Sequence, residues 1–139
     1  MELERALRFA ATRHNALLTT LMADGRPQQS VVFYLIDGDR FTISVTNSRV
    51  KTRNLRRDPR AALFIAGDDP FVWVSFGGTV ELSEVARHRH DEVADRLVEY
   101  YRRAVGEHQD WSAYRAAMVD EGRLMATFVA TSATGMLRD

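Results

Sequence analysis

Three basic residues near the start of a short predicted helix are the side chains of this sequence best suited to chemistry. Arg49, Lys51 and Arg53 follow a polar turn in which Asn47 or Ser48 is expected to cap the helix. Arg49 and Arg53 are four residues apart and share a face, and Lys51 can reach round from the first turn. Helix N-termini, arginine forks and lysine ammonium groups all bind phosphate. We interpret this stretch as a phosphate-binding corner.

The corner has to be positioned by two apolar segments, 41–45 before the helix 49–57 and 61–66 after it. Both segments are predicted to be strands, and a proline after the helix prevents its continuation. Arg56 and Arg57 lie in the last helical turn, where cations are favoured by the helix dipole. A solvated basic helix face therefore remains the alternative to phosphate binding.

The remaining elements follow from hydrophobic periodicity and turn signals. Asp-Gly pairs favour hairpins, and the Gly77-Gly78 pair favours a bulge within a strand. Short strands with glycine-rich corners are typical of a closed antiparallel barrel. The predicted helices are 2–13, 84–105 with Ser83 as N-cap, and 112–119 with Ser112 as N-cap, and the further strands are 16–22, 28–36, 40–45, 72–82 and 123–130, followed by a polar tail.

Bulk composition limits the class of protein. The 139 residues fit one domain, 1–139, and equal numbers of acidic and basic residues disfavour a dedicated nucleic-acid binder. The absence of cysteine excludes disulfides and thiolate chemistry. No apolar run reaches membrane-spanning length and no signal peptide is visible, so we expect a cytoplasmic protein without membrane contact. His88 and His90 would point to different helix faces, so no metal site is expected.

The predicted second strand carries an apolar run, Val31 to Ile36, on both of its faces. A barrel interior covers only one face, so a helix, a ligand or a second subunit must cover the other. The sequence leaves the choice open, and we expect a dimer.

Four segments, in order, carry a resemblance to a known family. They read D-G-R-P-Q-Q-S-V-V, S-R-V-K-T-R-N-L-R-R-D-P-R-A, G-T-V-E-L and G-E-H-Q-D-W-S-A-Y-R-A-A-M-V. They resemble the pyridoxamine-phosphate-oxidase-like flavoproteins, especially the actinobacterial branch that uses FMN or the deazaflavin coenzyme F420. The resemblance implies a mainly β protein with peripheral helices: a six- or seven-stranded antiparallel split barrel of the FMN-binding type. It also implies a homodimer with two cofactor sites at the interface.

The resemblance assigns roles by position. It places Arg49 and Lys51 on the cofactor phosphate, with Arg53 and Asn54 in support. The remaining site residues are Ser44, Val45 and Thr46 along the ribityl chain and ring, Gln28, Gln29, Ser30, Val31 and Val32 beside the ring, and Trp73, together with the tail near Met136, from the second subunit.

The sequence departs from the family in its tail, which lacks the arginine-rich segment that grips the substrate in the true pyridoxamine-phosphate oxidases. Vitamin B6 oxidation is therefore disfavoured, and the physiological substrate, a small molecule, is left open. The sequence also shows no evident acid, base or nucleophile. Hydride transfer by a flavin or deazaflavin needs few side chains, because the cofactor carries the reaction.

We expect an oxidoreductase that uses coenzyme F420, with an FMN-dependent enzyme or a non-catalytic flavin-binding protein as the alternatives. The basic run resembles the deazaflavin-using branch most closely. The lactyl and glutamate tail of coenzyme F420 needs more positive charge than FMN does, and Arg53, Arg56 and Arg57 offer a surplus.

Overall fold

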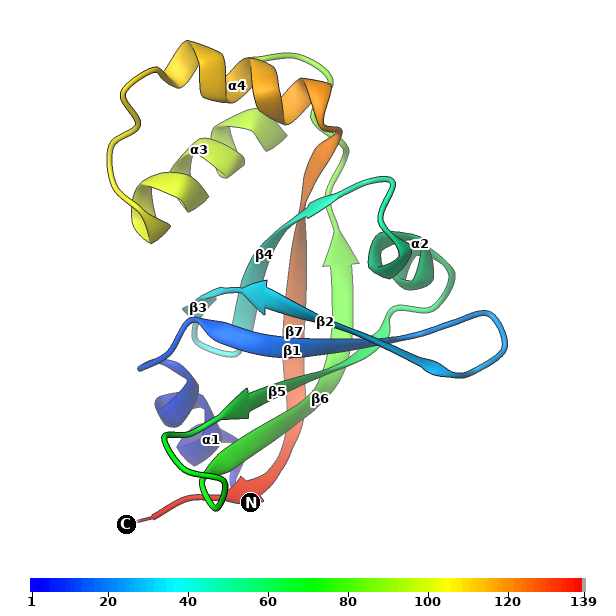
Figure 1. Cartoon of the computed structure of the whole chain (residues 1–139), viewed down its shortest axis with the longest axis vertical. Helices are drawn as coiled ribbons and strands as arrows, with labels where there is room; N and C mark the ends of the chain where they lie inside the picture. The colour runs from blue at the N-terminus through cyan, green and yellow to red at the C-terminus, as the bar shows by residue number, and fades with distance from the viewer. Residues whose placement is uncertain (139) are drawn as a thin grey trace.

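The computed structural model describes residues 1–138 as one antiparallel seven-stranded sheet with four helices around it (Figure 1). The strands are β1 (Asn15–Leu21), β2 (Pro27–Phe33), β3 (Leu35–Asp37), β4 (Arg40–Thr46), β5 (Arg60–Ala66), β6 (Trp73–Leu82) and β7 (Arg123–Met136). The helices are α1 (Leu3–Ala10), α2 (Val50–Arg57), α3 (Glu92–Ala104) and α4 (Trp111–Asp120). The strands lie in the order β2-β1-β5-β6-β7-β4-β3. The predicted mainly β split barrel is confirmed.

The two edge strands of the sheet, β2 and β3, are consecutive in the chain. β3 pairs with β4, with Leu35 opposite Thr42, whereas β2 pairs from end to end with β1. The chain bends at Tyr34 between them, so the predicted single strand 28–36 is two strands in the structure. β2 is not hydrogen-bonded to β4, and the barrel is split between these two strands.

Alternating side chains of the strands fill the barrel with apolar groups. Phe41 is fully buried and contacts the rings of Tyr34, Phe76 and Phe128 at centroid separations of 5.0, 5.1 and 5.8 Å. Helix α1 covers one end of this core, where the Tyr34 hydroxyl donates a 2.7 Å hydrogen bond to the Ala10 carbonyl. That bond satisfies a buried polar group, which would otherwise destabilise the core.

A bulge interrupts β6 at the predicted glycine pair. The register of β6 against β7 shifts between Gly77 and Gly78. A Cβ atom on Gly78 would lie 2.0 Å from the Val129 carbonyl oxygen, so only glycine permits this close approach of the two strands. The bulge prediction is confirmed.

Helix α3 is shorter than the predicted helix 84–105. The backbone N–H groups of Ser83 and Ala86 donate to β7 carbonyls at 2.9 and 2.8 Å, so the chain still follows the sheet there. The helix begins after Asp91, whose carboxylate accepts the Ala94 N–H at 2.8 Å. Ser83 is therefore not the N-cap, because tertiary pairing overrides the helical periodicity of this segment.

Three further boundaries differ from the sequence prediction. Helix α1 ends at Ala10, before the predicted end at 13. Helix α4 is capped by Asp110, which accepts the Ala113 N–H at 3.1 Å, rather than by Ser112. Strand β7 extends to Met136, beyond the predicted end at 130, because it pairs with β6 along the whole of that strand.

Helices α3 and α4 form a hairpin at one end of the barrel, above β4 and β7 in Figure 1. Val93 and Leu97 of α3 pack with Met118 of α4 and Met125 of β7 in a second buried cluster. This cluster fixes the helix pair to the sheet. Within residues 1–138 no helix combines the length and the apolar character needed to cross a bilayer.

Candidate functional site

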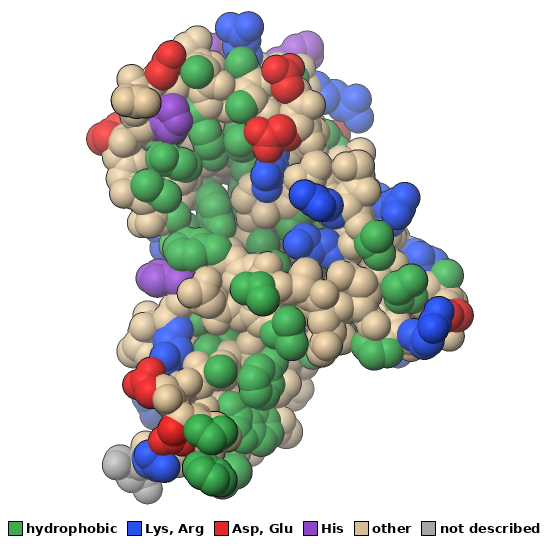
Figure 2. All heavy atoms as spheres, viewed as in Figure 1, with side chains coloured by type: hydrophobic (Ala, Val, Ile, Leu, Met, Phe, Trp, Pro, Cys, Tyr) green, Lys and Arg blue, Asp and Glu red, His purple; other side chains and the backbone are tan. Residues whose placement is uncertain are grey.

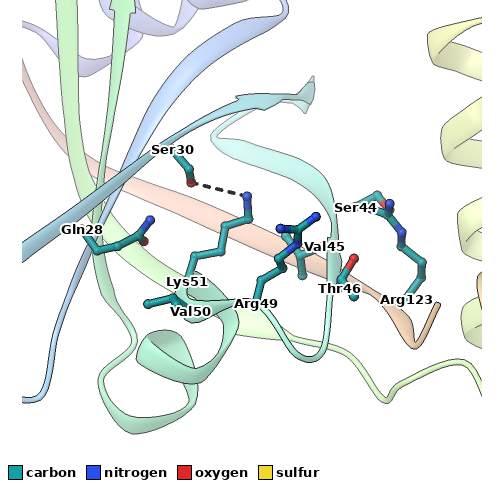
Figure 3. Close-up of a pocket in the computed structure, with 9 residues that line it drawn as sticks. All are labelled: Gln28, Ser30, Ser44, Val45, Thr46, Arg49, Val50, Lys51 and Arg123. Carbon is teal, nitrogen blue, oxygen red and sulfur yellow. Dashed lines mark hydrogen bonds between the residues drawn. The ribbon is translucent and has the colours of Figure 1, made fainter.

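A cavity of about 310 Å³ lies in the split of the barrel, between β2 and β4 and beside the start of α2 (Figure 3). We call it the split cavity. Its lining residues are Gln28, Ser30, Ser44, Val45, Thr46, Arg49, Val50, Lys51 and Arg123. Seven of these residues were predicted as site residues from the sequence. They line one cavity because β2 and β4 lie on the two sides of the split and α2 begins directly after β4.

Helix α2 presents Arg49 and Lys51 to the split cavity because its first turn is held by the preceding loop. The Thr52 hydroxyl donates to the Thr46 carbonyl at 2.7 Å. The N-cap position is Arg49, without a side-chain cap, so the predicted caps are wrong. Asn47, one of them, instead accepts a 2.6 Å hydrogen bond from Arg56 through Oδ1.

Lys51 is the only lysine in the sequence, and it is half-buried in the split cavity. Its ammonium group lies 3.4 Å from the Ser30 hydroxyl oxygen (Figure 3). Burial lowers the pKa of Lys51, and the nearby Arg49 and Arg123 guanidinium groups lower it further. An anion in the cavity would offset both effects, because it favours the charged form of the amine.

Arg123 also lines the split cavity, and the sequence reasoning missed it. It begins β7 and lies opposite Thr46 in the register of β4 against β7, which brings it to the split cavity. Its guanidinium group pairs with Glu121 at 3.0 Å. No local motif marks this arginine, and only the pairing of β7 with β4 reveals its place.

Asn54 supports the site rather than lining it. Its side-chain amide, almost fully buried, donates to the hydroxyl of the buried Thr20 at 3.0 Å. That hydroxyl donates to Gln28 Oε1 at 3.0 Å, and Asn54 Oδ1 accepts from Arg57 at 3.0 Å. This network connects α2 to β1 and to the Gln28 side chain at the cavity wall.

Alternation along β2 separates the predicted ring-lining residues. Gln28 and Ser30 face the split cavity, whereas Gln29 points away and donates to the Thr19 hydroxyl at 3.3 Å. Val32 is buried in the barrel core, and Val31 is 75% exposed on the opposite face of the strand. None of these last three residues lines the split cavity, although Val31 and Val32 line the cavity that adjoins it.

Two further predicted residues, Arg53 and Trp73, also lie outside the split cavity in this chain. Arg53 is exposed on α2. Trp73 stacks on Phe64 at 5.6 Å, lies opposite Met136 on β7, and pairs with Ala66 at the end of β5 away from α2. Its assignment to the site of a second subunit stays a prediction.

A second cavity, of about 320 Å³, adjoins the first and shares Ser44, Lys51 and Arg123 with it. We call it the tyrosine chamber. Its remaining walls are apolar and aromatic, and they come from β2 and β4 on one side and from the α3–α4 hairpin on the other. These residues are Val31, Val32, Phe33, Ile43, Tyr100, Tyr101, Tyr114 and Met118. Figure 2 shows hydrophobic side chains in the recess between the helix pair and the strands beneath it.

The split cavity has the chemistry of an anion site. Three cationic side chains line it, and its lining contains no carboxylate. None of the four histidines lines either cavity. Among the described residues, no three histidine, aspartate or glutamate side chains are close enough together to hold a metal ion.

Several solved structures share this fold. A conserved hypothetical protein of Mycobacterium tuberculosis, Rv2991, is 25% identical with a TM-score of 0.71, over 96% of this chain and 82% of that one. A protein described as an F420 reductase is 23% identical with a TM-score of 0.67, over 91% and 94% of the two chains. HutZ, a heme storage protein of Vibrio cholerae, is 14% identical with a TM-score of 0.69, over 98% and 96%.

A sequence model of a protein family matches most of the chain. The model is described as pyridoxamine 5'-phosphate oxidase, and the match runs from residue 3 to residue 127. The match includes the split, the basic turn of α2 and Arg123, so the cavity residues lie within it. The chain belongs to the pyridoxamine 5'-phosphate oxidase-like split-barrel family, which includes oxidoreductases.

Proposed function

We propose that this protein is an oxidoreductase that binds coenzyme F420 through its phosphate and transfers hydride to or from a small organic substrate. The observation that carries the proposal is the split cavity, where Arg49 and Lys51 lie together with Arg123 beside them and no carboxylate belongs to the lining. A phosphate dianion is the common cofactor group that such a set of cations fits best.

The residues of the chain have positioning roles in this proposal. The bound deazaflavin or flavin would supply the hydride chemistry. Arg49 and Lys51 hold the phosphate, and Ser30 orients the Lys51 ammonium group. Ser44 and Thr46, on the opposite wall, offer polar groups to the ribityl chain.

Coenzyme F420 is preferred to FMN because positive charge continues beyond the cavity along α2. Arg53 is exposed there, and Arg56 is exposed beside the loop that leads into the helix. The carboxylates of the deazaflavin tail can pair with such cations, whereas FMN ends at its phosphate. The fold shared with a protein described as an F420 reductase is consistent with this preference.

The cofactor choice predicts the colour of the purified protein. Expression in a host that makes FMN but no deazaflavin should give a colourless protein, and added coenzyme F420 should then quench its tryptophan fluorescence. Absorption spectra and a fluorescence titration measure both outcomes, with added FMN as the matched ligand. A yellow protein with stoichiometric FMN would reassign the activity to an FMN-dependent oxidoreductase.

Heme is a weaker candidate, although HutZ is described as a heme storage protein. Heme iron is commonly held by histidine, and none of the four histidines lines either cavity. The cation-lined cavity therefore favours a phosphate-bearing cofactor.

We also propose that the protein is a cytoplasmic homodimer, without nucleic-acid partners. Phe64, Phe71 and Met136 are 37%, 65% and 53% exposed, and Trp73 lies between Phe64 and Met136. Figure 2 shows hydrophobic side chains gathered at this end of the molecule. Exposed apolar patches of this kind mark protein interfaces.

Light scattering at micromolar concentration should give about twice the 15.8 kDa chain mass, and a species of 15.8 kDa alone would refute the dimer.

A further inference from the structure

Three tyrosines, Tyr100, Tyr101 and Tyr114, line the tyrosine chamber, and the backbone engages the hydroxyls of two of them. Tyr100 donates its hydroxyl to the Phe33 carbonyl, and Tyr114 donates its hydroxyl to the Leu97 carbonyl, each at 2.9 Å. Both hydroxyls are thus held by backbone acceptors. Tyr101 packs beside Tyr114 at a centroid separation of 5.0 Å, which extends the aromatic wall.

The aromatic walls are also uncharged at neutral pH. Burial raises the pKa of Tyr114 to about 12, and burial raises the pKa of Tyr100 as well. Both phenols therefore keep their protons. The surface they form suits the face of a planar unsaturated ring, which stacks favourably on aromatic side chains.

All the formal charge of the chamber is positive and lies at the boundary with the split cavity. Lys51 and Arg123 are the two charged residues in its lining. The arginines and the lysine reach this boundary from opposite directions, Arg49 and Lys51 from α2 and Arg123 from β7 (Figure 3). A phosphate held by Arg49 and Lys51 would leave Arg123 facing the chamber, where Glu121 is its one ion-pair partner among residues 1–138.

We propose that the tyrosine chamber is the substrate subsite and takes a flat, unsaturated organic anion such as an aromatic carboxylate. The ring lies against Tyr101 and Tyr114, and the anionic group pairs with Arg123. Arg123 is thereby a specificity-determining residue, because it distinguishes an anion from a neutral compound of the same shape. The inference rests on the proposed function, in which the cofactor phosphate occupies the split cavity.

Two probes of the same shape test the proposal: 2-naphthoate, which is an anion, and 2-naphthamide, which is neutral. Calorimetry measures their affinities for the cofactor-loaded protein and for the free protein, and backbone amide NMR locates them. We expect 2-naphthoate to bind at least about tenfold more tightly than the amide, since a charge-assisted contact contributes that much. The shifted amides should belong to the α3–α4 hairpin and to β2 around Val31.

Matched variants separate the role of Arg123 from a general charge effect. R123Q should abolish the preference for the anion, and E121Q, which removes the competing carboxylate, should strengthen 2-naphthoate binding. The control is R103Q, because Arg103 on α3 pairs with Asp37 at 3.0 Å and lies outside the chamber. This variant should keep the full preference.

Four results would contradict the proposed subsite. Equal affinities of the two probes, a preference that survives in R123Q, no binding of 2-naphthoate, or amide shifts confined to the Phe64 and Trp73 end would overturn the proposal. If 2-naphthoate binds in the chamber of a protein that binds no flavin or deazaflavin, the proposed function fails while the anion subsite stands. If the cofactor binds and 2-naphthoate does not, the subsite fails and the proposed function stands.

Discussion

Replacing Lys51 with alanine should weaken cofactor binding about tenfold or more without lowering thermal stability. A charge-assisted contact to a phosphate contributes roughly 1.5–3 kcal/mol of binding free energy. In the free protein the charge of Lys51 contributes little to folding stability, because burial and the Arg49 and Arg123 guanidinium groups disfavour its ammonium form. Fluorescence titration with coenzyme F420 and FMN gives the affinity, and thermal unfolding gives the stability.

The matched control removes one positive charge from the same helix. Arg57 donates to the Leu21 carbonyl at 2.6 Å and to Asn54 Oδ1 at 3.0 Å, and it lies outside the split cavity. Arg57→Ala should therefore lower the melting temperature and leave cofactor affinity nearly unchanged. If the Lys51 and Arg57 variants bind cofactor equally well, α2 is a solvated basic helix and the phosphate site is refuted.

Replacing Asn54 with alanine should lower the free energy of unfolding by about 1–3 kcal/mol, the cost of leaving buried polar groups without partners. The change removes the donor to the buried Thr20 hydroxyl and one acceptor of Arg57. Chemical denaturation measures the loss. Cofactor affinity should also fall, because α2 and Gln28 lose their common support.

Asn47→Ala is the control for this second prediction. Asn47 also accepts an arginine hydrogen bond, from Arg56, but it is exposed, so water can replace the lost contact. The Asn47→Ala substitution should lower the free energy of unfolding by less than about 0.5 kcal/mol, as surface substitutions usually do. Equal losses in the two variants would show that the buried network contributes nothing to the attachment of α2.

The barrel could be predicted because its signals are local. Asp-Gly turns, alternating strands and the Gly77-Gly78 bulge each follow from a few neighbouring residues. The helix predicted from residue 84 failed because its periodicity is real but its backbone bonds to β7 at Ser83 and Ala86. A sequence pattern reports the conformation that a segment favours in isolation. In the folded protein this segment forms backbone hydrogen bonds to β7 instead of a helix.

The site residues show the same difference between local signals and long-range pairing. Arg49 and Lys51 were found because one short helix carries both. Arg123 was missed because strand register, not sequence proximity, brings it to the cavity. The resemblance assigned Asn54 to the support of the cofactor phosphate, and in the structure its amide bonds to the hydroxyl of the buried Thr20 on β1. Spacing on a helix cannot tell a ligand-facing amide from one that holds the helix in place.

Titration of the Lys51 side chain by NMR, with and without cofactor, tests the central claim most directly. Lys51 is the only lysine, so its signal needs no assignment beyond separation from the N-terminal amine. The free protein should show a pKa below the ordinary lysine value, because burial and the flanking arginines disfavour the ammonium form. Binding of the phosphate-bearing cofactor should raise that pKa, and affinity should then fall as pH rises through the pKa of the complex, since the contact needs the protonated amine. Riboflavin, which lacks the phosphate, should leave the pKa where it was. A Lys51 pKa that does not respond to a bound phosphate-bearing cofactor would contradict the account.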